Sequence, residues 1–441
     1  MKNALDIFLD IMEANRKGFD KGIYSVCSAH PDVLEVCFKQ AKRDESVLLI
    51  ESTSNQVNQY GGYTGMKPPD FVRYINRIAE ETGFPKEKIL LGGDHLGPNP
   101  WKKLNSEQAM EEAKMLVAEY VKAGYRKIHL DASMLCADDT GERKNHLPDE
   151  IVAQRASILC HVAEETWKRY CHDSPPPVYV IGTEVPVPGG AQEEEDEVIP
   201  TTPEDAEKSI TVTRKQFAKV GLAGTWERVT GVVVQPGVEF GDDRVSHYQP
   251  EKAEALSEKI MELDHLVFEA HSTDYQTKKH LKALVKGHFC ILKVGPWLTF
   301  AYREALFALE AMEVELLGKN NKDLSKLGET LERAMLKVPK YWNPYYKGKE
   351  QEQAFKRKYS FSDRVRYYWS VQEVRAAKDK LLKNLQSNEI PLSVLSQFMP
   401  TQFYQVCRGR LSLTPKDLVN SHIQTVAGIY SHACGLSQND K

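Results

Sequence analysis

The stretch Lys88–His95, KILLGGDH, joins an apolar run to an acid and an imidazole. Its first half is continuously apolar, as expected for a parallel strand buried on both faces. Its last two residues, Asp94 and His95, follow the glycine pair that ends the apolar run. Barrel enzymes carry their chemistry at the carboxyl ends of such strands. The stretch therefore predicts a buried strand that ends in half of a metal and proton-transfer site.

Similar runs recur through about the first 300 residues, with helical patterns between them. Crossovers long enough for a helix indicate parallel strands, and eight such units fit a (β/α)8 TIM barrel, which typically needs roughly 250 residues. The competing fold is a doubly wound open sheet, which is disfavoured because no Gly-x-Gly-x-x-Gly follows the first run. The eight runs are Gly22–Cys27, Val47–Thr53, Lys88–His95, Arg126–Ser133, Val178–Val185, Val229–Gly237, Leu266–Asp274 and Phe289–Pro296.

Three segments between the runs carry signals for the start of a helix. Pro69–Thr82 follows a proline, Ser106–Ala123 opens with a serine that we expect to cap it, and Asp149–Tyr170 opens with acids. After the fifth run, Gly189–Asp205 is acidic and contains proline, which indicates a solvated loop or a lid.

The strand rhythm stops near Gly318, and helical patterns with several prolines continue to the end of the chain. We therefore expect two parts: a (β/α)8 barrel over residues 1–317, which carries the active-site face, and a helical C-terminal extension over residues 318–441. Whether the extension closes over the barrel mouth or forms an interface stays open at this point.

Composition excludes several classes of protein. Of 441 residues, 41% are hydrophobic, and 58 Lys and Arg face 62 Asp and Glu for a net charge of -4, which gives no electrostatic footprint for nucleic acid. No apolar stretch approaches the ~20 residues needed to cross a bilayer, and residues 1–10 resemble an amphipathic helix more than a secretory signal. The eight cysteines form no Cys-x-x-Cys pair. We expect a cytoplasmic protein with free thiols.

Three strand ends suggest a metal site. The third, fifth and seventh strands end at His95, Glu184 and His271, and alternate strands of a barrel contribute side chains to the same layer. Two imidazoles and a carboxylate suit a divalent ion with an open position, zinc in the first place and manganese as the alternative. Asp94 would be a general acid or base beside the ion if the chain bends at Gly92-Gly93, because neighbours in a regular strand point to opposite faces.

The fourth and eighth strands add further candidates. His129 and Asp131 are two residues apart and share one face, although His129 could instead pack in the barrel interior and Asp131 could cap the next segment. Lys293 could form a structural ion pair, a Schiff base or a phosphate contact. We predict Asp94, Asp131 and Lys293 as the catalytic residues.

Polar residues near other strand ends would bind a polyol substrate. Glu51, Asn55 and Gln56 crowd the second strand and its loop. Gln235 closes the sixth strand, and Asp274 follows the seventh. Arg364 and Arg366 in the extension would form surface or interdomain ion pairs, with a substrate phosphate as the alternative partner.

Long motifs are spread over nearly the whole chain. They are Ser25–Pro31 (SVCSAHP), Glu51–Gly65 (ESTSNQVNQYGGYTG), Gly92–Asn99 (GGDHLGPN), Lys127–Ser133 (KIHLDAS), Gly182–Gly190 (GTEVPVPGG), Val234–Phe240 (VQPGVEF), Glu269–Gln276 (EAHSTDYQ), Leu292–Phe300 (LKVGPWLTF) and Ser362–Trp369 (SDRVRYYW). Together these motifs resemble the D-tagatose-1,6-bisphosphate aldolase Z-type subunit family (GatZ/KbaZ-like). The resemblance implies a role beside a separate catalytic Y-type subunit in galactitol and N-acetylgalactosamine breakdown. Members have also been called tagatose-6-phosphate kinases and are associated with ketohexose 4-epimerization. The kinase name finds no support, since neither a Walker-type loop nor a kinase Gly-rich loop is present.

More distantly, the strand ends are similar to those of class II aldolases. There an Asp-His pair on the third strand supplies a proton donor and a metal ligand, which implies these roles for Asp94 and His95, with Glu184 and His271 as further ligands. Two departures matter. Those aldolases have a metal-binding His on the sixth strand, and the residue nearest to that position in this chain is Gln235. They also have a Gly-rich phosphate cradle after the seventh strand, where this chain has Ser272–Asp274. A phosphate nest needs closely approaching backbone N–H groups, which glycine provides most readily.

The resulting hypothesis is metal-dependent chemistry on a ketose or ketose phosphate. The ion would chelate the C2 carbonyl and C3 hydroxyl while the C3–C4 bond breaks, and Asp94 or Asp131 would move the proton on the C4 oxygen. Release of the aldehyde gives an aldolase, whereas rotation and rebonding gives a 4-epimerase that interconverts fructose-type and tagatose-type sugars. A third possibility is a non-catalytic scaffold that stabilises a Y-type class II aldolase subunit. We also expect the chain to form an oligomer.

Overall fold

Eight parallel strands close into a barrel in the order β1-β10-β9-β6-β5-β4-β3-β2. The computed structural model describes residues 2–140, 147–182, 198–263 and 265–437. β1 pairs in parallel with both β10 and β2, which closes the sheet. The predicted (β/α)8 barrel is therefore confirmed, and the open doubly wound sheet is excluded.

The barrel strands coincide with the eight predicted apolar runs, and most of their residues are buried. Because both faces of these strands are covered, each one needs a continuous rather than an alternating apolar pattern. A small antiparallel pair, β7 (Glu239–Phe240) and β8 (Val245–Ser246), follows the sixth barrel strand. The barrel strands are β1 (Ile23–Val26), β2 (Leu48–Thr53), β3 (Ile89–Leu96), β4 (Lys127–Leu130), β5 (Val178–Ile181), β6 (Val229–Val234), β9 (Val267–Ala270) and β10 (Phe289–Val294).

Helices connect and surround these strands. α4 and α5 have the predicted bounds, and α3 begins one residue earlier than predicted, at Pro68. The cap of α4 differs from the prediction: the Asn105 side chain, not Ser106, accepts the backbone N–H of Gln108. The helices up to the end of the barrel are α1 (Ala4–Arg16), α2 (Pro31–Arg43), α3 (Pro68–Thr82), α4 (Ser106–Ala123), α5 (Asp149–Tyr170), α6 (Pro203–Lys219), α7 (Pro250–Met261), α8 (Lys278–Lys286) and α9 (Pro296–Leu317).

The amino-terminal end of the barrel is closed by α1. Phe8 and Met12 on this helix belong to a buried apolar cluster that also contains Leu49, Leu90 and Ile291 of the barrel strands. Burying this apolar face removes the floor of the barrel from water, so the opposite end is left for a ligand.

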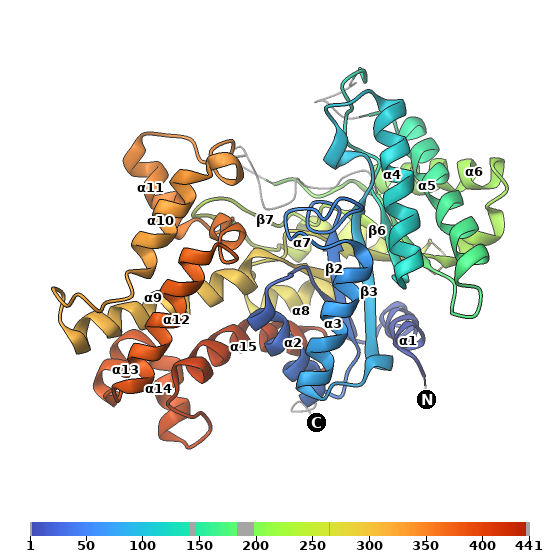
Figure 1. Cartoon of the computed structure of the whole chain (residues 1–441). Coiled ribbons are helices and arrows are strands. Elements are labelled where there is room, and N and C mark those ends of the chain that lie inside the picture. The colour runs from blue at the N-terminus through green and yellow to red at the C-terminus, as the bar shows by residue number, and fades with distance from the viewer. Residues whose placement is uncertain (1, 141–146, 183–197, 264, 438–441) are drawn as a thin grey trace.

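The chain beyond Leu317 is helical in its described part. Figure 1 shows α10 to α14 gathered on one side of the barrel, opposite α4 to α6. The last helix, α15, packs back on α2, α8 and α9, and its Tyr430 hydroxyl donates to the Thr273 carbonyl at 2.8 Å. The predicted division at residues 317 and 318 stays a prediction. These helices are α10 (Leu327–Lys337), α11 (Glu350–Tyr359), α12 (Gln372–Ser387), α13 (Leu392–Phe398), α14 (Pro400–Cys407) and α15 (Pro415–Ala433).

Two other predictions concern the rest of the chain. Most of the acidic segment Gly189–Asp205 lies outside the described residues, and its last residues begin α6. The eight cysteines are free. Within the described residues, no helix combines the length and the apolar character that crossing a membrane requires.

Candidate active site

A cavity of about 640 Å³ opens at the carboxyl ends of the barrel strands. Asp94, His95, His271 and Lys293 all line it, and they come from β3, the residue after β9, and β10. Strand ends that are far apart in the sequence thus deliver an acid, two imidazoles and an ammonium group to one enclosed space.

The end of β3 departs from a regular strand at His95. The register of β3 with β4 shifts between Gly93 and Leu96, and His95 has a φ of 50°, which is uncommon outside glycine. This local twist lets both Asp94 and His95 line the cavity. The bend that we expected at Gly92-Gly93 therefore lies at His95. Gly92 serves close packing instead, since a Cβ there would lie 2.6 Å from Cγ of Glu51.

Asp94 is ionised and held by three neighbours. Its Oδ1 lies 2.9 Å from Nδ1 of His129 and 2.9 Å from Nζ of Lys293. Burial alone would raise the pKa of Asp94, but the nearby His95 and Lys293 and the hydrogen bond with His129 outweigh it and hold this pKa well below its ordinary value. Asp94 can therefore accept a proton at neutral pH, and its second oxygen is the freer one.

His95 is oriented by Asp131. Nδ1 of His95 lies 2.8 Å from Oδ2 of Asp131, while Nε2 lies 3.7 Å from Asp94. Burial lowers the pKa of His95, but the charge of Asp94 and the bond to Asp131 raise it above its ordinary value. The other oxygen of Asp131 accepts the backbone N–H and the hydroxyl of Ser133. Asp131 does not line the cavity and acts through His95, so its contacts are those of a positioning residue.

The imidazole of His129 lies close to those of His95 and His271. The ring centres of His95, His129 and His271 lie 5.0 to 5.4 Å from one another. Nε2 of His129 is buried and has no hydrogen-bond partner among the described residues. Burial lowers the pKa of His271 to about 4, although the hydrogen bond to Glu269 opposes this shift. His271 is therefore neutral at pH 7 and keeps a lone pair for a ligand.

Beneath the cavity, four charged side chains form what we call the floor cluster: Glu51, Lys127, Glu269 and Lys293. Lys127 lies 2.7 Å from Glu51 and 2.6 Å from Glu269. Lys293 lies 2.5 Å from Glu51 and 3.4 Å from Glu269. Burial would lower the pKa of Lys293, but the surrounding carboxylates raise it well above its ordinary value. A protonated Lys293 favours the ion-pair alternative over Schiff-base formation, which needs a free amine.

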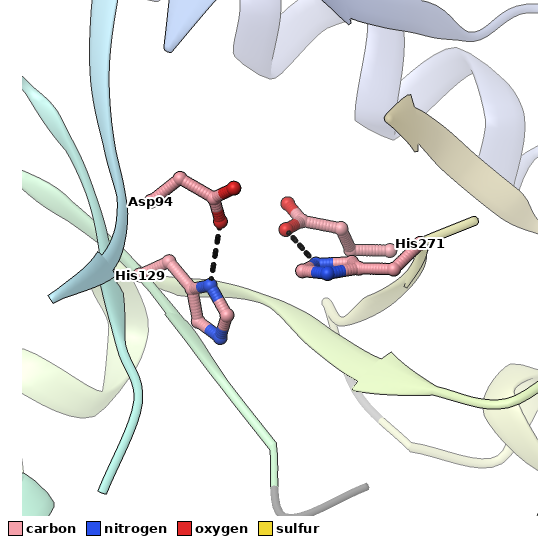
Figure 2. Close-up of side chains that lie close together, drawn as sticks. Asp94, His129 and His271 are labelled. Carbon is pink, nitrogen blue, oxygen red and sulfur yellow. Dashed lines mark hydrogen bonds and ion pairs between the residues drawn. The ribbon is translucent and has the colours of Figure 1, made fainter. Parts of the chain in front are cut away.

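Four side chains could hold a metal ion together. Asp94, His129, Glu269 and His271 each offer one ligand atom, and these atoms lie within 4.8 Å of one another. Figure 2 shows the hydrogen-bonded pair of Asp94 and His129 facing His271 and the carboxylate bound to its ring. Nitrogen and oxygen donors of this kind suit zinc or manganese.

The surrounding charge also fits a divalent cation. Four buried carboxylates, those of Glu51, Asp94, Asp131 and Glu269, face only two lysines, Lys127 and Lys293. Without the imidazoles, the carboxylates exceed the lysines by two negative charges, and this excess and the unpartnered Nε2 of His129 both favour a cation. A protonated His95 beside Asp131 would reduce the excess by one.

This group shares only His271 with the predicted ligand set. His95 lies beside it, with its ring centre 5.0 Å from that of His271. Glu184 lies outside the described residues. His129 was left open between an interior position and a functional one, and Glu269 was missed, although its spacing of two from His271 places both on one side of β9.

The predicted substrate-binding residues are not all in the cavity. Asn55, Gln56 and Asp274 line it. Glu51 lies beneath it in the floor cluster. Gln235 does not line it, and its side-chain oxygen accepts the backbone N–H groups of Gly237 and Val238.

The extension forms one wall of the cavity, which answers the question that the sequence left open. Lys340, Tyr341, Arg364 and Arg366 line the cavity together with the residues of the strand ends. The ring of Tyr367 also lines it, stacked on Tyr341 with centres 4.8 Å apart. The helical extension therefore contributes to the barrel mouth.

A family comparison covers nearly the whole chain. Residues 8–435 match the family described as D-tagatose-1,6-bisphosphate aldolase subunit GatZ/KbaZ-like. The chain belongs to this family. The GatZ/KbaZ-like assignment agrees with the resemblance found in the motifs, and it places the cavity in a family of aldolase subunits.

Among solved structures, one is similar to this chain over almost its whole length. That structure, described as a probable tagatose 6 phosphate kinase from Sinorhizobium meliloti 1021, is 44% identical with a TM-score of 0.85, and the match covers 94% of this chain and 100% of that one. The YdjI aldolase from Escherichia coli K12 is 11% identical with a TM-score of 0.41, covering 88% and 98%. The fructose-bisphosphate aldolase of Campylobacter jejuni is 13% identical with a TM-score of 0.42, covering 87% and 95%. At that level of similarity, neither aldolase structure bears on the chemistry of this chain.

Proposed function

We propose that this GatZ/KbaZ-like chain acts on a ketose by metal-dependent cleavage or formation of the C3–C4 bond, as an aldolase subunit. The observation that carries the proposal is the convergence of Asp94, two imidazoles and Lys293 on one cavity, with the buried ring of His129 within 5.4 Å of both imidazoles. A scaffold alone would not need buried acids and imidazoles that face a cavity, because their burial costs free energy.

His129, Glu269 and His271 would hold the ion, with Asp94 beside it. When bound, a divalent cation there would supply Lewis-acid polarisation of the ketose carbonyl. Asp94 would accept the proton of the C4 hydroxyl as the C3–C4 bond breaks and the electron pair moves toward the C2 carbonyl. The ammonium of Lys293 would stabilise the negative charge that develops on the carbonyl oxygen. In the reverse direction Asp94 returns the proton to the C4 oxygen.

The same groups would serve a ketohexose 4-epimerase. If the aldehyde stays in the cavity, rotates and rebonds on its other face, the product is the 4-epimer instead of two trioses. The residue roles do not change between the two reactions, so the fate of the aldehyde separates them. The kinase description of the S. meliloti protein has no counterpart in the motifs of this chain.

The test uses purified full-length protein treated with a chelator and then supplied with zinc or manganese. It is incubated with D-tagatose 1,6-bisphosphate and, separately, with D-fructose. Triose phosphate formation supports the aldolase, and tagatose formation supports the epimerase. Activity that appears only after a Y-type subunit is added, and that does not need the His271 side chain of this chain, contradicts the proposal and supports an accessory role.

Metal content per chain tests the ligand assignment separately from turnover. Loss of bound zinc in His129→Ala and His271→Ala supports the group described above. Loss in His95→Ala and Glu184→Ala, with His129→Ala unaffected, supports the ligand set predicted from the strand ends. His172→Ala is the matched control, because this histidine is exposed and, among the described residues, its ion-pair partner is the exposed Asp173. Unchanged metal content in every variant contradicts a metal site here.

A further inference from the structure

Two arginines of the extension face the cavity without a carboxylate partner. Arg364 and Arg366 lie in the short turn Arg364–Tyr367, between α11 and α12, and both line the cavity that contains Asp94 and His271. We call them the rim arginines. Among the described residues, neither guanidinium group has a carboxylate oxygen within the 4.0 Å of an ion pair.

The hydrogen bonds of the rim arginines go only to neutral oxygens. Arg364 is 3% exposed, donates to the Tyr341 carbonyl at 3.1 Å, and has an Nε with no partner among the described residues. Its guanidinium lies over the ring of Tyr345. Arg366 donates to the carbonyls of Ser362 and Asp363 and to the Tyr367 hydroxyl. Carbonyl and phenol oxygens satisfy donors but do not balance the positive charge.

The nearest acids are committed elsewhere. Asp363 bonds with Arg303 and Thr299. Asp274 accepts the backbone N–H groups of Gly295 and Trp297 at 3.0 and 2.9 Å. Both carboxylates act on Arg366 through space but do not pair with it. The donors of the rim arginines that face the cavity are therefore left for a ligand.

Other buried arginines of this chain do have carboxylate partners. Arg357 is 1% exposed, pairs with Glu332 and Glu350, and stacks on Trp342. Arg303 pairs with Asp363. Burying a guanidinium without a counter-ion is costly, so the chain balances it where the arginine only supports the fold. Among the buried arginines of the described residues, Arg364 alone has no ion-pair partner, and the half-buried Arg366 beside it at the cavity has none either.

The N-terminus of α9 holds no free place for an anion. Many barrel enzymes bind phosphate in the loops after strands seven and eight and at the N-terminus of a helix there. In this chain the Asp274 carboxylate already accepts the N–H groups of Gly295 and Trp297 at that position. An acidic substrate group would be repelled there and attracted to the rim arginines.

We propose that Arg364 and Arg366 form a subsite for the acidic end of the sugar substrate, a phosphate or carboxylate remote from the reacting carbonyl. The subsite rests on the proposed function only in taking this cavity as the substrate site. The ring of Tyr367 packs on both Tyr341 and Tyr63 beside the arginines, with its centre 4.8 Å from each, and so keeps the subsite in place before the substrate binds.

The test measures binding by calorimetry, without turnover. D-tagatose, D-tagatose 6-phosphate and D-tagaturonate are titrated into the full chain, with and without chelator. The wild type is expected to bind at least one of the acidic sugars about tenfold or more tightly than D-tagatose. Arg364→Met is expected to reduce that preference by about tenfold to a hundredfold while leaving D-tagatose binding unchanged. Comparing the titrations with D-tagatose 6-phosphate and D-tagaturonate shows whether the subsite binds a phosphate or a carboxylate.

Arg357→Met is the matched control, because this arginine is equally buried and stacked on an aromatic ring but does not line the cavity. Arg364→Lys keeps the positive charge and serves as the conservative variant. The melting temperature of each variant shows whether it is folded. Equal binding of neutral and acidic sugars by the wild type, or an unchanged preference in both Arg364→Met and Arg366→Met, overturns the subsite. Arginine-dependent binding without turnover under any metal or partner condition supports the subsite and contradicts the proposed function.

Discussion

The floor cluster and the rim arginines bury charge in opposite ways. Lys127 and Lys293 each contact two or more carboxylates at the base of the cavity, whereas Arg364 and Arg366 contact none in the described part of the chain. Balanced buried charge supports the framework, because each ion is held by its partners. Unbalanced buried charge at a cavity is expected to meet a ligand. The predictions below test this distinction, beginning with the largest expected effect.

Asp94 borders the floor cluster, since one of its oxygens is held by Lys293 and His129 and the other is freer. Asp94→Asn is expected to lower kcat of the ketose reaction by about a hundredfold to ten thousandfold, because it removes the proton acceptor. Asp131→Asn is expected to cost less, about tenfold to a hundredfold, since Asp131 acts through His95. Steady-state kinetics of both variants, with melting temperatures as the folding control, check this order. A larger loss in Asp131→Asn would mean that the proton acceptor is misassigned.

Lys127 tests the structural role of the floor cluster, in which the buried charges are paired. Its side chain is fully buried and is held between Glu51 and Glu269. Lys127→Met leaves these two carboxylates with one ammonium group fewer, so the free energy of unfolding should fall by about 3–5 kcal/mol. Urea denaturation measures the change. The double variant Lys127→Met/Glu269→Gln should recover part of the loss, and a single variant as stable as the wild type would refute the structural role of the floor cluster.

The strand pattern explains why the fold and part of the site were predictable. A strand buried on both faces must be apolar throughout, so runs such as Val229–Val234 are visible in the sequence. Parallel strands in a barrel end on one rim, which predicts that Asp94, His271 and Lys293 approach one another. The positions of these side chains follow from topology alone.

Pairings across the barrel were not predictable in this way. The spacing of two along β4 and β9 places Lys127 with His129, and Glu269 with His271, on one side of each strand. Nothing local indicates that Lys127 on β4 contacts Glu269 on β9, because the two strands are not neighbours in the sheet. The rim arginines were named from the sequence, with a substrate phosphate as the alternative partner, but their place at the cavity was not predictable because the sequence does not show where the extension folds back.

Asp274 offers a third environment, a buried carboxylate held by backbone N–H groups alone. Burial raises its pKa from 3.8 to about 6, although the N–H groups of Trp297 and Gly295 oppose this. Because the folded state holds the proton more tightly than the unfolded state does, the free energy of unfolding should fall as the pH rises from about 4 to about 6.

Asp274→Asn removes the free-energy cost of burying an ionised carboxylate, and it keeps an oxygen that can accept the same N–H groups. The variant should be more stable than the wild type by up to about 3 kcal/mol near pH 8, with the gain shrinking below about pH 6 and absent near pH 4. Denaturation curves across this range measure it. A gain that does not vary with pH would show that Asp274 is already compensated, most directly by Arg366, and would weaken the case that the rim arginines are free for a ligand.

The smallest expected effect compares two arginines of the extension directly. Arg357→Met breaks ion pairs with Glu332 and Glu350, and because Glu350 is largely exposed, the loss should be about 1–2 kcal/mol. Arg364→Met removes an unbalanced buried charge and replaces it with an apolar side chain over Tyr345, so the loss should be smaller than about 0.5 kcal/mol, or become a gain. Denaturant unfolding without sugar measures both variants.

Comparing the stability losses of Arg357→Met and Arg364→Met shows whether Arg364 supports the fold or recognises a ligand. If Arg364 only fastened the extension to the barrel, its removal should cost at least as much as that of Arg357, because both side chains stack on aromatic rings and are almost fully buried. If Arg364 is kept for a ligand, its removal is harmless to the empty protein, and its stabilising effect appears only when an acidic sugar binds. Adding the acidic sugar that the wild type prefers should then raise the melting temperature of Arg357→Met more than that of Arg364→Met, since a ligand stabilises the folded state more the more tightly it binds.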